Sequence, residues 1–366
     1  MRRLIATVLA VGALTVGALH AADGEPVKRP PPPGKAYRIG VLEPNMSIPH
    51  FVAQAYGFAD EAEKLGLKII MYDAGEHKNV AKQVAQMEDL IANKVDVICI
   101  VPGTTVTAMA QIDQAVAAGI PVVNVNIMSD NPKVLGRIRS DDYEQGRLQG
   151  EFIVKALNSK GNVVMMSGVS GNSAFINRAK GFHDYVAKHP DIKILSEQWT
   201  PNATDRGLKL MEDWSQTFPK IDAVYSGADR LAIGAAQALL AQGKKPGQVV
   251  ITTIDYNDDT ERFVREGWIS AAMAQTPVTM GRWGIRVALL ALAKQPIPDK
   301  LFTTMYVVTK DNADKIGISA VRQPKGCLLT ASEIGLIVDV RTIPQSRTNP
   351  QYNRETLPRS LSDASE

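Results

Sequence analysis

The side chains able to do acid–base, nucleophilic or metal chemistry are present but scattered along the chain. Beyond the apolar N-terminal segment, His50, His77, His183 and His189 lack the close helical spacing that pairs metal ligands. The usual metal, phosphate-loop, nucleophile-elbow and dinucleotide motifs are also missing from the sequence. We therefore expect no enzyme activity, no metal and no cofactor.

Two adjacent acidic pairs could also suggest acid–base chemistry. Asp141 with Asp142, and Asp258 with Asp259, each open a predicted helix. A carboxylate at that position accepts hydrogen bonds from free backbone N–H groups and interacts favourably with the helix dipole. We interpret both pairs as helix caps rather than as a catalytic site.

Alternating strands and helices must position any functional side chain. Each predicted strand is a short, continuously apolar run, which is typical of a parallel sheet buried on both faces. The first series has strands over 38–42, 68–72, 97–101 and 122–126, and helices over 50–65, 80–93 and 105–118. A second series alternates in the same way from 141 to 275, followed by a helix over 280–293 and a strand over 306–309. The pattern predicts an α/β protein with two doubly wound parallel-sheet lobes.

The N-terminus is typical of a secretory signal peptide over residues 1–22. Arg2 and Arg3 precede an apolar run over 4–19 and the small residues Ala21 and Ala22. A membrane anchor is the alternative, although the run is short for a span and no basic flank follows it. Because no cysteine lies near the expected cut, we expect export to the periplasm without a lipid anchor.

The composition is that of a soluble, folded protein. Of 366 residues, 45% are apolar and 22% are charged, and this length favours two domains. Without the signal peptide, 39 basic residues face 38 acidic ones, which argues against a nucleic-acid partner. The two cysteines leave two readings open: Cys99 as a buried apolar residue, or a Cys99–Cys327 disulfide.

Seven stretches resemble the periplasmic sugar-binding family typified by ribose-binding and galactose-binding proteins. They are RIGVLEPNMSIPHFVAQAYGFADEAEKLGLKI, AAGIPVVNVN, IRSDDYEQGRLQGEFI, GNSAFINRAKGF, AVYSGADRLAIGAAQAL, ITTIDYND and AAMAQTP, in the family's order. The resemblance implies the type I periplasmic binding protein fold, with three crossings forming the hinge and one sugar held at the carboxyl ends of both sheets. The implied N-terminal lobe is 36–139 plus 276–302, and the C-terminal lobe is 140–275 plus 303–320.

The resemblance also implies three ligand-binding residues. Arg178 in GNSAFINRAKGF matches an arginine that donates a fork of hydrogen bonds to sugar oxygens. Asp255 in ITTIDYND matches an aspartate that accepts from hydroxyls, and it also ends an apolar strand. Gln275 in AAMAQTP matches a hinge glutamine. The alternatives are a surface arginine, a turn aspartate and a solvated linker residue.

Two neighbouring residues on the first helix are further candidates. Phe51 matches an aromatic that packs on the sugar, but its place on the apolar helix face favours core packing almost equally. His50 stands where ribose binders carry a second phenylalanine, and it could add a hydrogen bond to the ligand.

Other departures from the ribose-binding pattern remove polar groups. Asn126 and Ile127 replace an Asp-Arg pair, Ala228 replaces an asparagine, and Ile48 replaces a polar residue. A hydroxyl left without its partner costs about 1–3 kcal/mol, so ribose should bind poorly. Asn126 still offers a donor and an acceptor. We therefore expect a ligand with fewer hydroxyls or an apolar portion, such as a deoxysugar, small polyol, lactone or furanone.

Two segments lie outside the predicted lobes. Residues 23–35 contain a proline run that favours an extended spacer. Residues 321–366 form a C-terminal extension, in which 328–340 retains apolar residues that could dock on a lobe, whereas 341–366 is polar and typical of disorder.

The resemblance implies a monomeric protein that closes about its hinge on a small ligand. The partner that recognises the closed form would be the permease of an ABC-type importer. The alternative partner is a membrane sensor kinase or chemoreceptor, and the sequence does not separate the two.

Overall fold

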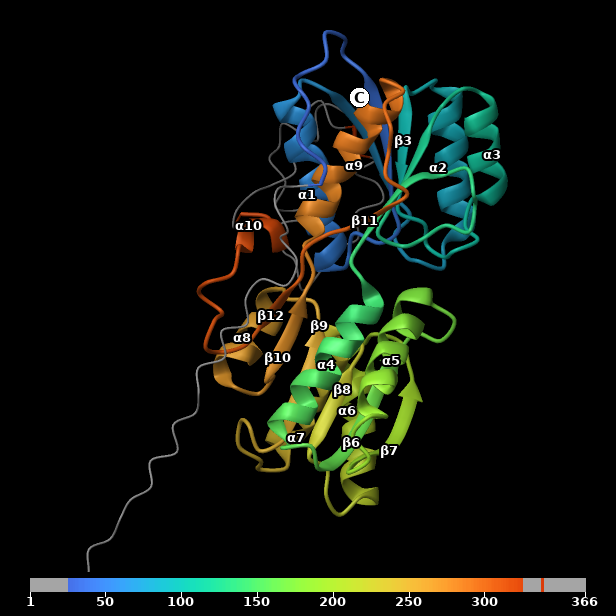
Figure 1. Ribbon diagram of the computed structural model, residues 1–366. Coiled ribbons are helices and arrows are strands. Elements are labelled where there is room, and N and C mark those ends of the chain that lie inside the picture. The colour runs from blue at the N-terminus through green and yellow to red at the C-terminus, as the bar shows by residue number, and fades with distance from the viewer. Residues whose placement is uncertain (1–25, 325–336, 339–366) are drawn as a thin grey trace, which may run out of the picture.

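The N-terminal lobe is built on a parallel sheet. The computed structural model describes residues 26–324 and 337–338 and places two α/β lobes end to end (Figure 1). The strands of the N-terminal lobe are β1 (Arg38–Glu43), β2 (Lys68–Asp73), β3 (Val97–Ile100), β4 (Val122–Val125), β5 (Leu135–Arg139), β11 (Lys300–Phe302) and β13 (Ile337–Val338). They lie in the order β11-β5-β4-β3-β1-β2-β13, and their pairings are parallel.

The C-terminal lobe repeats this plan with one exception. Its strands are β6 (Gly161–Gly168), β7 (Ile192–Trp199), β8 (Ala223–Ser226), β9 (Val250–Ile254), β10 (Ala271–Ala274) and β12 (Tyr306–Val308). The order is β12-β10-β9-β8-β6-β7, and only the edge strand β12 pairs antiparallel among the described strands. The predicted fold class, two doubly wound α/β lobes, is confirmed.

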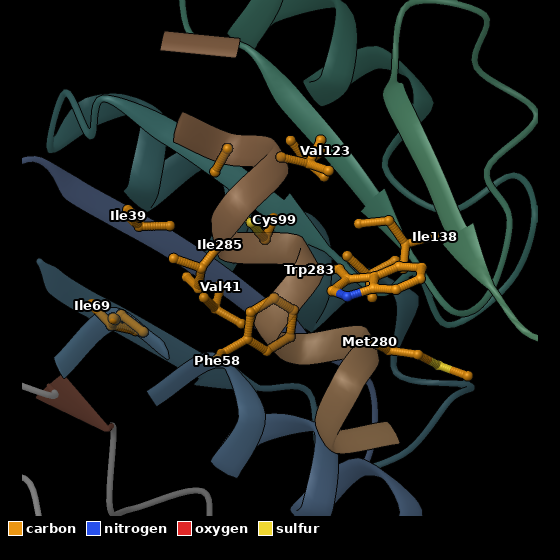
Figure 2. Close-up of a cluster of buried hydrophobic side chains, with 14 of the residues drawn as sticks. Ile39, Val41, Phe58, Ile69, Cys99, Val123, Ile138, Met280, Trp283 and Ile285 are labelled. Carbon is orange, nitrogen blue, oxygen red and sulfur yellow. The ribbon is translucent and has the colours of Figure 1, made fainter. Parts of the chain in front are cut away.

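Helices cover both faces of each sheet. Those of the N-terminal lobe are α1 (Pro49–Lys64), α2 (Val80–Ala92), α3 (Met109–Ala117) and α9 (Pro277–Leu292). Those of the C-terminal lobe are α4 (Asp142–Ala156), α5 (Ser173–Val186), α6 (Thr204–Thr217), α7 (Asp229–Ala241) and α8 (Asp258–Glu266), and the short α10 (Ile318–Val321) follows β12. Successive residues of a strand face opposite layers. Cys99 of β3 therefore joins the core under α1 and α9 (Figure 2), whereas Ile98 and Ile100 face α2 and α3.

Between β1 and β12 the chain passes between the two sheets three times. It leaves the N-terminal sheet after β5 to begin α4, returns after β10 through α9 to β11, and leaves again after β11 to form β12. Each lobe is therefore assembled from segments that are distant in sequence. The short strands β5 and β11, which the apolar pattern did not predict, pair with each other at the sheet edge next to these passages.

Glycines allow pairs of helices to approach closely. A Cβ atom added to Gly146 of α4 would lie 1.7 Å from the carbonyl oxygen of Arg178 on α5. The relation is reciprocal, because a Cβ atom on Gly181 would lie 2.0 Å from the carbonyl oxygen of Tyr143. This contact brings Asp142, at the start of α4, beside the arginine of α5.

The segment expected to be a spacer packs in part on the N-terminal lobe. Val27 is only 3% exposed and belongs to the core of that lobe. Arg29 and Arg286 both form ion pairs with the fully buried carboxylate of Glu61, at 2.7 and 2.8 Å. Residues 26–29 thus pack on the N-terminal lobe through the Val27 side chain and the Arg29–Glu61 ion pair.

The termini and cysteines are partly outside the described residues. Among the described helices, none is long and apolar enough to span a membrane. Cys99 is a free, buried cysteine, and burial raises the pKa of its thiol. The predicted signal peptide, Cys327 and most of the C-terminal extension lie outside the described residues.

Candidate functional site

Two polar residues leave equivalent strands in the two lobes with the same backbone geometry. Asn126 follows β4 with φ 62°, and Asp255 follows β9 with φ 71°. In each case the backbone N–H donates to a carbonyl of the next strand, Ile138 or Met273. Asn and Asp tolerate this left-handed conformation better than most residues. The turn places both polar side chains at the carboxyl edges of the sheets.

The Asp255 carboxylate joins groups from both lobes. Its Oδ1 accepts a hydrogen bond of 2.8 Å from Nε2 of Gln275, at the hinge after β10. The same oxygen lies 3.2 Å from Nδ1 of His50, which is on α1 of the opposite lobe. Burial alone would raise the pKa of Asp255, but His50, Arg178 and the Gln275 amide together hold that pKa below its usual range.

The contact continues through His50 into the N-terminal lobe. Nδ2 of Asn126 lies 2.7 Å from Nε2 of His50. The same amide group donates to Oε1 of Gln54 at 3.4 Å. Because Gln54 follows His50 by four residues, both project from the same face of α1. Four of the six predicted site residues, His50, Asn126, Asp255 and Gln275, thus form one connected set, which we call the inter-lobe site together with Gln54.

Arg178 is buried beside the inter-lobe site but has protein partners. Its Nε and Nη2 lie 3.0 Å from Oδ1 of Asp142, and its Nη1 donates to the Gly227 carbonyl at 3.2 Å. The guanidinium also lies 5.3 Å from the ring centre of Phe175. A guanidinium has five N–H donors. Arg178 is therefore buried rather than on the surface, although it is paired with a neighbour as that alternative also held, and the contacts named here use three of its five donors.

Phe51 is mainly a core residue. It is 6% exposed and belongs to the hydrophobic cluster of the N-terminal lobe. Its ring packs edge-on against both His50 and His77, each with centroids 5.2 Å apart. Burial, and then the charge of His50, lowers the pKa of His77 to about 4. Phe51 therefore supports the orientation of His50 from behind.

Asp229, which we had not predicted as a site residue, lies near Asp255. Its carboxylate accepts hydrogen bonds from Nδ2 of Asn202, at 3.1 Å, and from Nδ2 of Asn257. Burial, and then the charge of Asp255, raises the pKa of Asp229. The C-terminal lobe therefore presents two neighbouring carboxylates, surrounded mainly by amide donors.

The acidic pairs at helix starts have different roles. Asp141 caps α4, because its side chain accepts from the backbone N–H of Glu144. At α8 the cap is Asn257, and Asp258 and Asp259 stand in the first turn. Asp142 is not a cap but the partner of Arg178. We interpreted Asp142 as a helix cap because it stands at a helix start. Gln54 was missed, although a polar residue on the buried face of α1 is a sequence signal for a functional role.

Comparison with known proteins shows the family. The model of the periplasmic binding protein domain matches residues 39–296, which is more than half of the chain. The chain belongs to this family. The predicted membership in the type I periplasmic sugar-binding proteins is confirmed by the relatives and by the shared fold.

Relatives with similar sequences or folds carry names that refer to sugars or polyols. The ribose import binding protein of Bacillus subtilis is 30% identical over 69% of this chain and 81% of its own length. A xylitol-binding protein of Mycolicibacterium smegmatis is 29% identical over 85% of this chain and 86% of its own length. A solute-binding protein of Actinobacillus succinogenes, solved with D-allose, has a TM-score of 0.72 and 25% identity, covering 76% of this chain and all of that one.

Proposed function

We propose that the protein captures a small sugar-like or polyol-like ligand between its two lobes and delivers it to an ABC-type importer. The observation that carries the proposal is the Asp255 carboxylate, which contacts Gln275 at the hinge and His50 of the other lobe through one oxygen. Ligand contacts made by both lobes stabilise the closed form over the open one. The permease then recognises the closed form.

The site also supports a ligand with a polar edge and an apolar portion. Asp255, Asp229 and the two remaining Arg178 donors can bind hydroxyls, because a carboxylate accepts from two donors and a guanidinium donates in a fork. In the N-terminal lobe the end of β4 offers Asn126 beside His50, and the apolar Ile127 follows. We therefore propose a deoxysugar, small polyol, lactone or furanone in preference to ribose.

Relatives named for import and for polyol binding support the importer as the partner, rather than a sensor kinase or chemoreceptor. We further propose that the protein acts as a periplasmic monomer without a lipid anchor, after removal of residues 1–22. The named relatives are binding proteins, which agrees with a function without turnover.

A thermal-shift screen of the purified protein tests the proposed function. Pentoses, hexoses, deoxysugars, polyols and small lactones are each added in excess, because a ligand that binds only the folded state raises the melting temperature. We expect at least one polyol or sugar-like compound to raise it, and Asp255→Asn to reduce that rise strongly. Asparagine is chosen because alanine would be strained at φ 71°.

The matched control is Asp205→Ala, because this carboxylate is 79% exposed on α6. The control should keep the full ligand-induced rise. No rise with any of these compounds, or an equal rise in Asp255→Asn, would overturn the proposal.

A further inference from the structure

A continuous chain of polar side chains crosses from one lobe to the other through His50. It runs from Asp255 through His50 and Asn126 to Gln54, with links of 3.2, 2.7 and 3.4 Å. The His50 side chain is only 8% exposed and Gln54 is fully buried. His50 and Gln54 therefore depend on the other groups of the chain, rather than on solvent, for their hydrogen bonds.

The positions of the donors define the first state of this chain. An ionised carboxylate can only accept, so the proton of a neutral His50 lies on Nδ1 and points to Asp255. Nε2 is then an acceptor, and it receives a hydrogen bond from Nδ2 of Asn126. Asn126 donates its second proton to Oε1 of Gln54. The buried Nε2 of Gln54 has no hydrogen-bond partner.

A second state arises when His50 takes up a proton on Nε2. Both ring nitrogens are then donors, so Nε2 needs an acceptor where Asn126 now presents a donor. A half-turn of the Asn126 amide supplies Oδ1 at this place. A half-turn of Gln54 then lets its previously unpartnered Nε2 donate to the same oxygen. Every link of the chain is kept, while His50 gains a positive charge and the two amides turn over.

We propose that His50 is a proton-operated latch, which draws the two lobes together when its imidazole is protonated. This inference rests on the proposed function, in which lobe closure captures the ligand, and it names a regulation of that closure. The added charge lies on the N-terminal lobe at 3.2 Å from a carboxylate of the C-terminal lobe. The hydrogen bond to Asp255 is charge-assisted in both states, and protonation adds the attraction between two opposite charges across the lobes, which favours the closed form.

The charged groups around His50 keep its interaction with the C-terminal lobe attractive when the imidazole is protonated. Asp255 keeps its negative charge in mild acid, because His50 and Arg178 hold its pKa low against the effect of burial. Asp229 lies beside Asp255 and, when ionised, adds to the negative charge facing His50. Behind His50, the pKa of His77 is about 4, so His77 stays neutral in mild acid and does not repel the imidazolium.

One further basic group lies at the lobe interface. Arg230 of α7 donates to the Ser47 carbonyl of the opposite lobe at 3.4 Å. Its charge does not titrate in the range where imidazoles do. Arg230 therefore adds a contact between the lobes that does not change with pH in this range.

Small-angle X-ray scattering of the ligand-free protein tests the latch. The radius of gyration is measured at about pH 8 and about pH 5, the range in which imidazoles change charge. The wild-type protein should become more compact at the lower pH, with the closed-to-open ratio rising about tenfold, within the usual range of coupling between sites. His50→Gln should show the same dimensions at both pH values. His77→Gln, the matched control, should keep the wild-type response.

Asp255→Asn provides a second test if His50→Gln is poorly folded, which circular dichroism would show. It removes the charge on the other side of the latch and should also abolish the pH response. Wild-type dimensions that do not change with pH, or a full response in either folded variant, would overturn the proposal.

The proposed function is tested separately by ligand-induced thermal shifts at one fixed pH. A protein that binds its sugar but shows no pH response refutes the latch alone. A protein that shows the pH response but binds no sugar or polyol refutes the proposed function alone.

Discussion

The two lobes share a backbone design but bring different chemistry to their interface. In each, a parallel strand ends in a polar residue of left-handed conformation, Asn126 in one lobe and Asp255 in the other. In the C-terminal lobe the charges of Arg178 and Asp229 act on Asp255, and Asp142 holds Arg178, whereas the N-terminal lobe offers an imidazole, two amides and Phe51. The C-terminal lobe thus supplies the carboxylates and the guanidinium, and the N-terminal lobe supplies an aromatic ring, two amides and an imidazole.

Removing the buried ion pair of the C-terminal lobe should have the greatest effect on stability. Arg178→Ala leaves the buried carboxylate of Asp142 without its partner, which should lower the free energy of unfolding by about 3–5 kcal/mol. Chemical denaturation measures the loss.

Lys209→Ala is the control for that measurement. The Lys209–Asp213 pair on α6 is exposed on both sides, so its removal should cost less than about 1 kcal/mol. Similar losses in the two variants would mean that the Arg178 pair is no more important than a surface pair.

The next effect concerns ligand affinity. Asp255→Asn keeps the shape and the left-handed backbone but removes the charge, so the dissociation constant for the ligand found by screening should rise about 100-fold, equivalent to about 3 kcal/mol. Phe51→Leu in the other lobe should raise it less than about tenfold, because the ring packs mainly in the core. Isothermal titration calorimetry measures both. A larger loss from Phe51→Leu would reverse the roles assigned to the two lobes.

Acid should destabilise the N-terminal lobe through His77. Its pKa is lowered to about 4, so between the ordinary imidazole range and pH 4 the unfolded chain binds a proton that the folded chain does not. This contribution to stability is therefore lost as the pH falls, by up to about 3 kcal/mol. His77→Gln should reduce the slope of unfolding free energy against pH over this range. An unchanged slope would contradict the buried, neutral state of His77.

The smallest expected effect has the opposite dependence on pH and comes from Glu43. Its two carboxylate oxygens are buried without hydrogen-bond partners, and burial, followed by the charge of Asp73, raises its pKa. As the pH rises above the ordinary range of a glutamate, the unfolded chain releases this proton first, so stability is lost as the pH rises.

Glu43→Gln should therefore increase the free energy of unfolding at neutral pH by about 1 kcal/mol. The new amide could also donate to Oδ2 of Asp73, which is buried without a partner. Denaturation at mildly acidic and neutral pH measures the gain. A loss of stability at neutral pH would show that the ionised carboxylate is needed.

Much of the fold could be predicted from the sequence, because strands that are buried on both faces consist of apolar residues. Strands such as Val97–Ile100 are buried on both faces and are therefore continuously apolar. β5 was not predicted, because as Leu135–Arg139 it is only half buried and carries two arginines. Val27 was missed because it lies beside a proline run that favours an extended chain.

The site could be predicted only in part, because some of its contacts depend on how helices and lobes are placed. Asp255 and Asn126 were accessible because each directly follows an apolar strand. The pairing of Asp142 with Arg178 depends on the close approach of α4 and α5 through Gly146 and Gly181, which no local pattern reveals. His50 was singled out as an unusual residue, but its contact with Asp255 depends on how the two lobes are placed.

The central claim is that residues of both lobes bind the same ligand molecule. A double-mutant cycle of Asn126 and Asp255, one from each lobe, tests this claim. Ligand affinity is measured by calorimetry for the wild type, Asn126→Gly, Asp255→Asn and the double variant; glycine is chosen because it accepts φ 62°. Residues that act on one ligand from opposite lobes should be coupled by more than about 0.5 kcal/mol. Strictly additive losses, or affinities that neither variant changes, would show that Asn126 and Asp255 do not bind one ligand together.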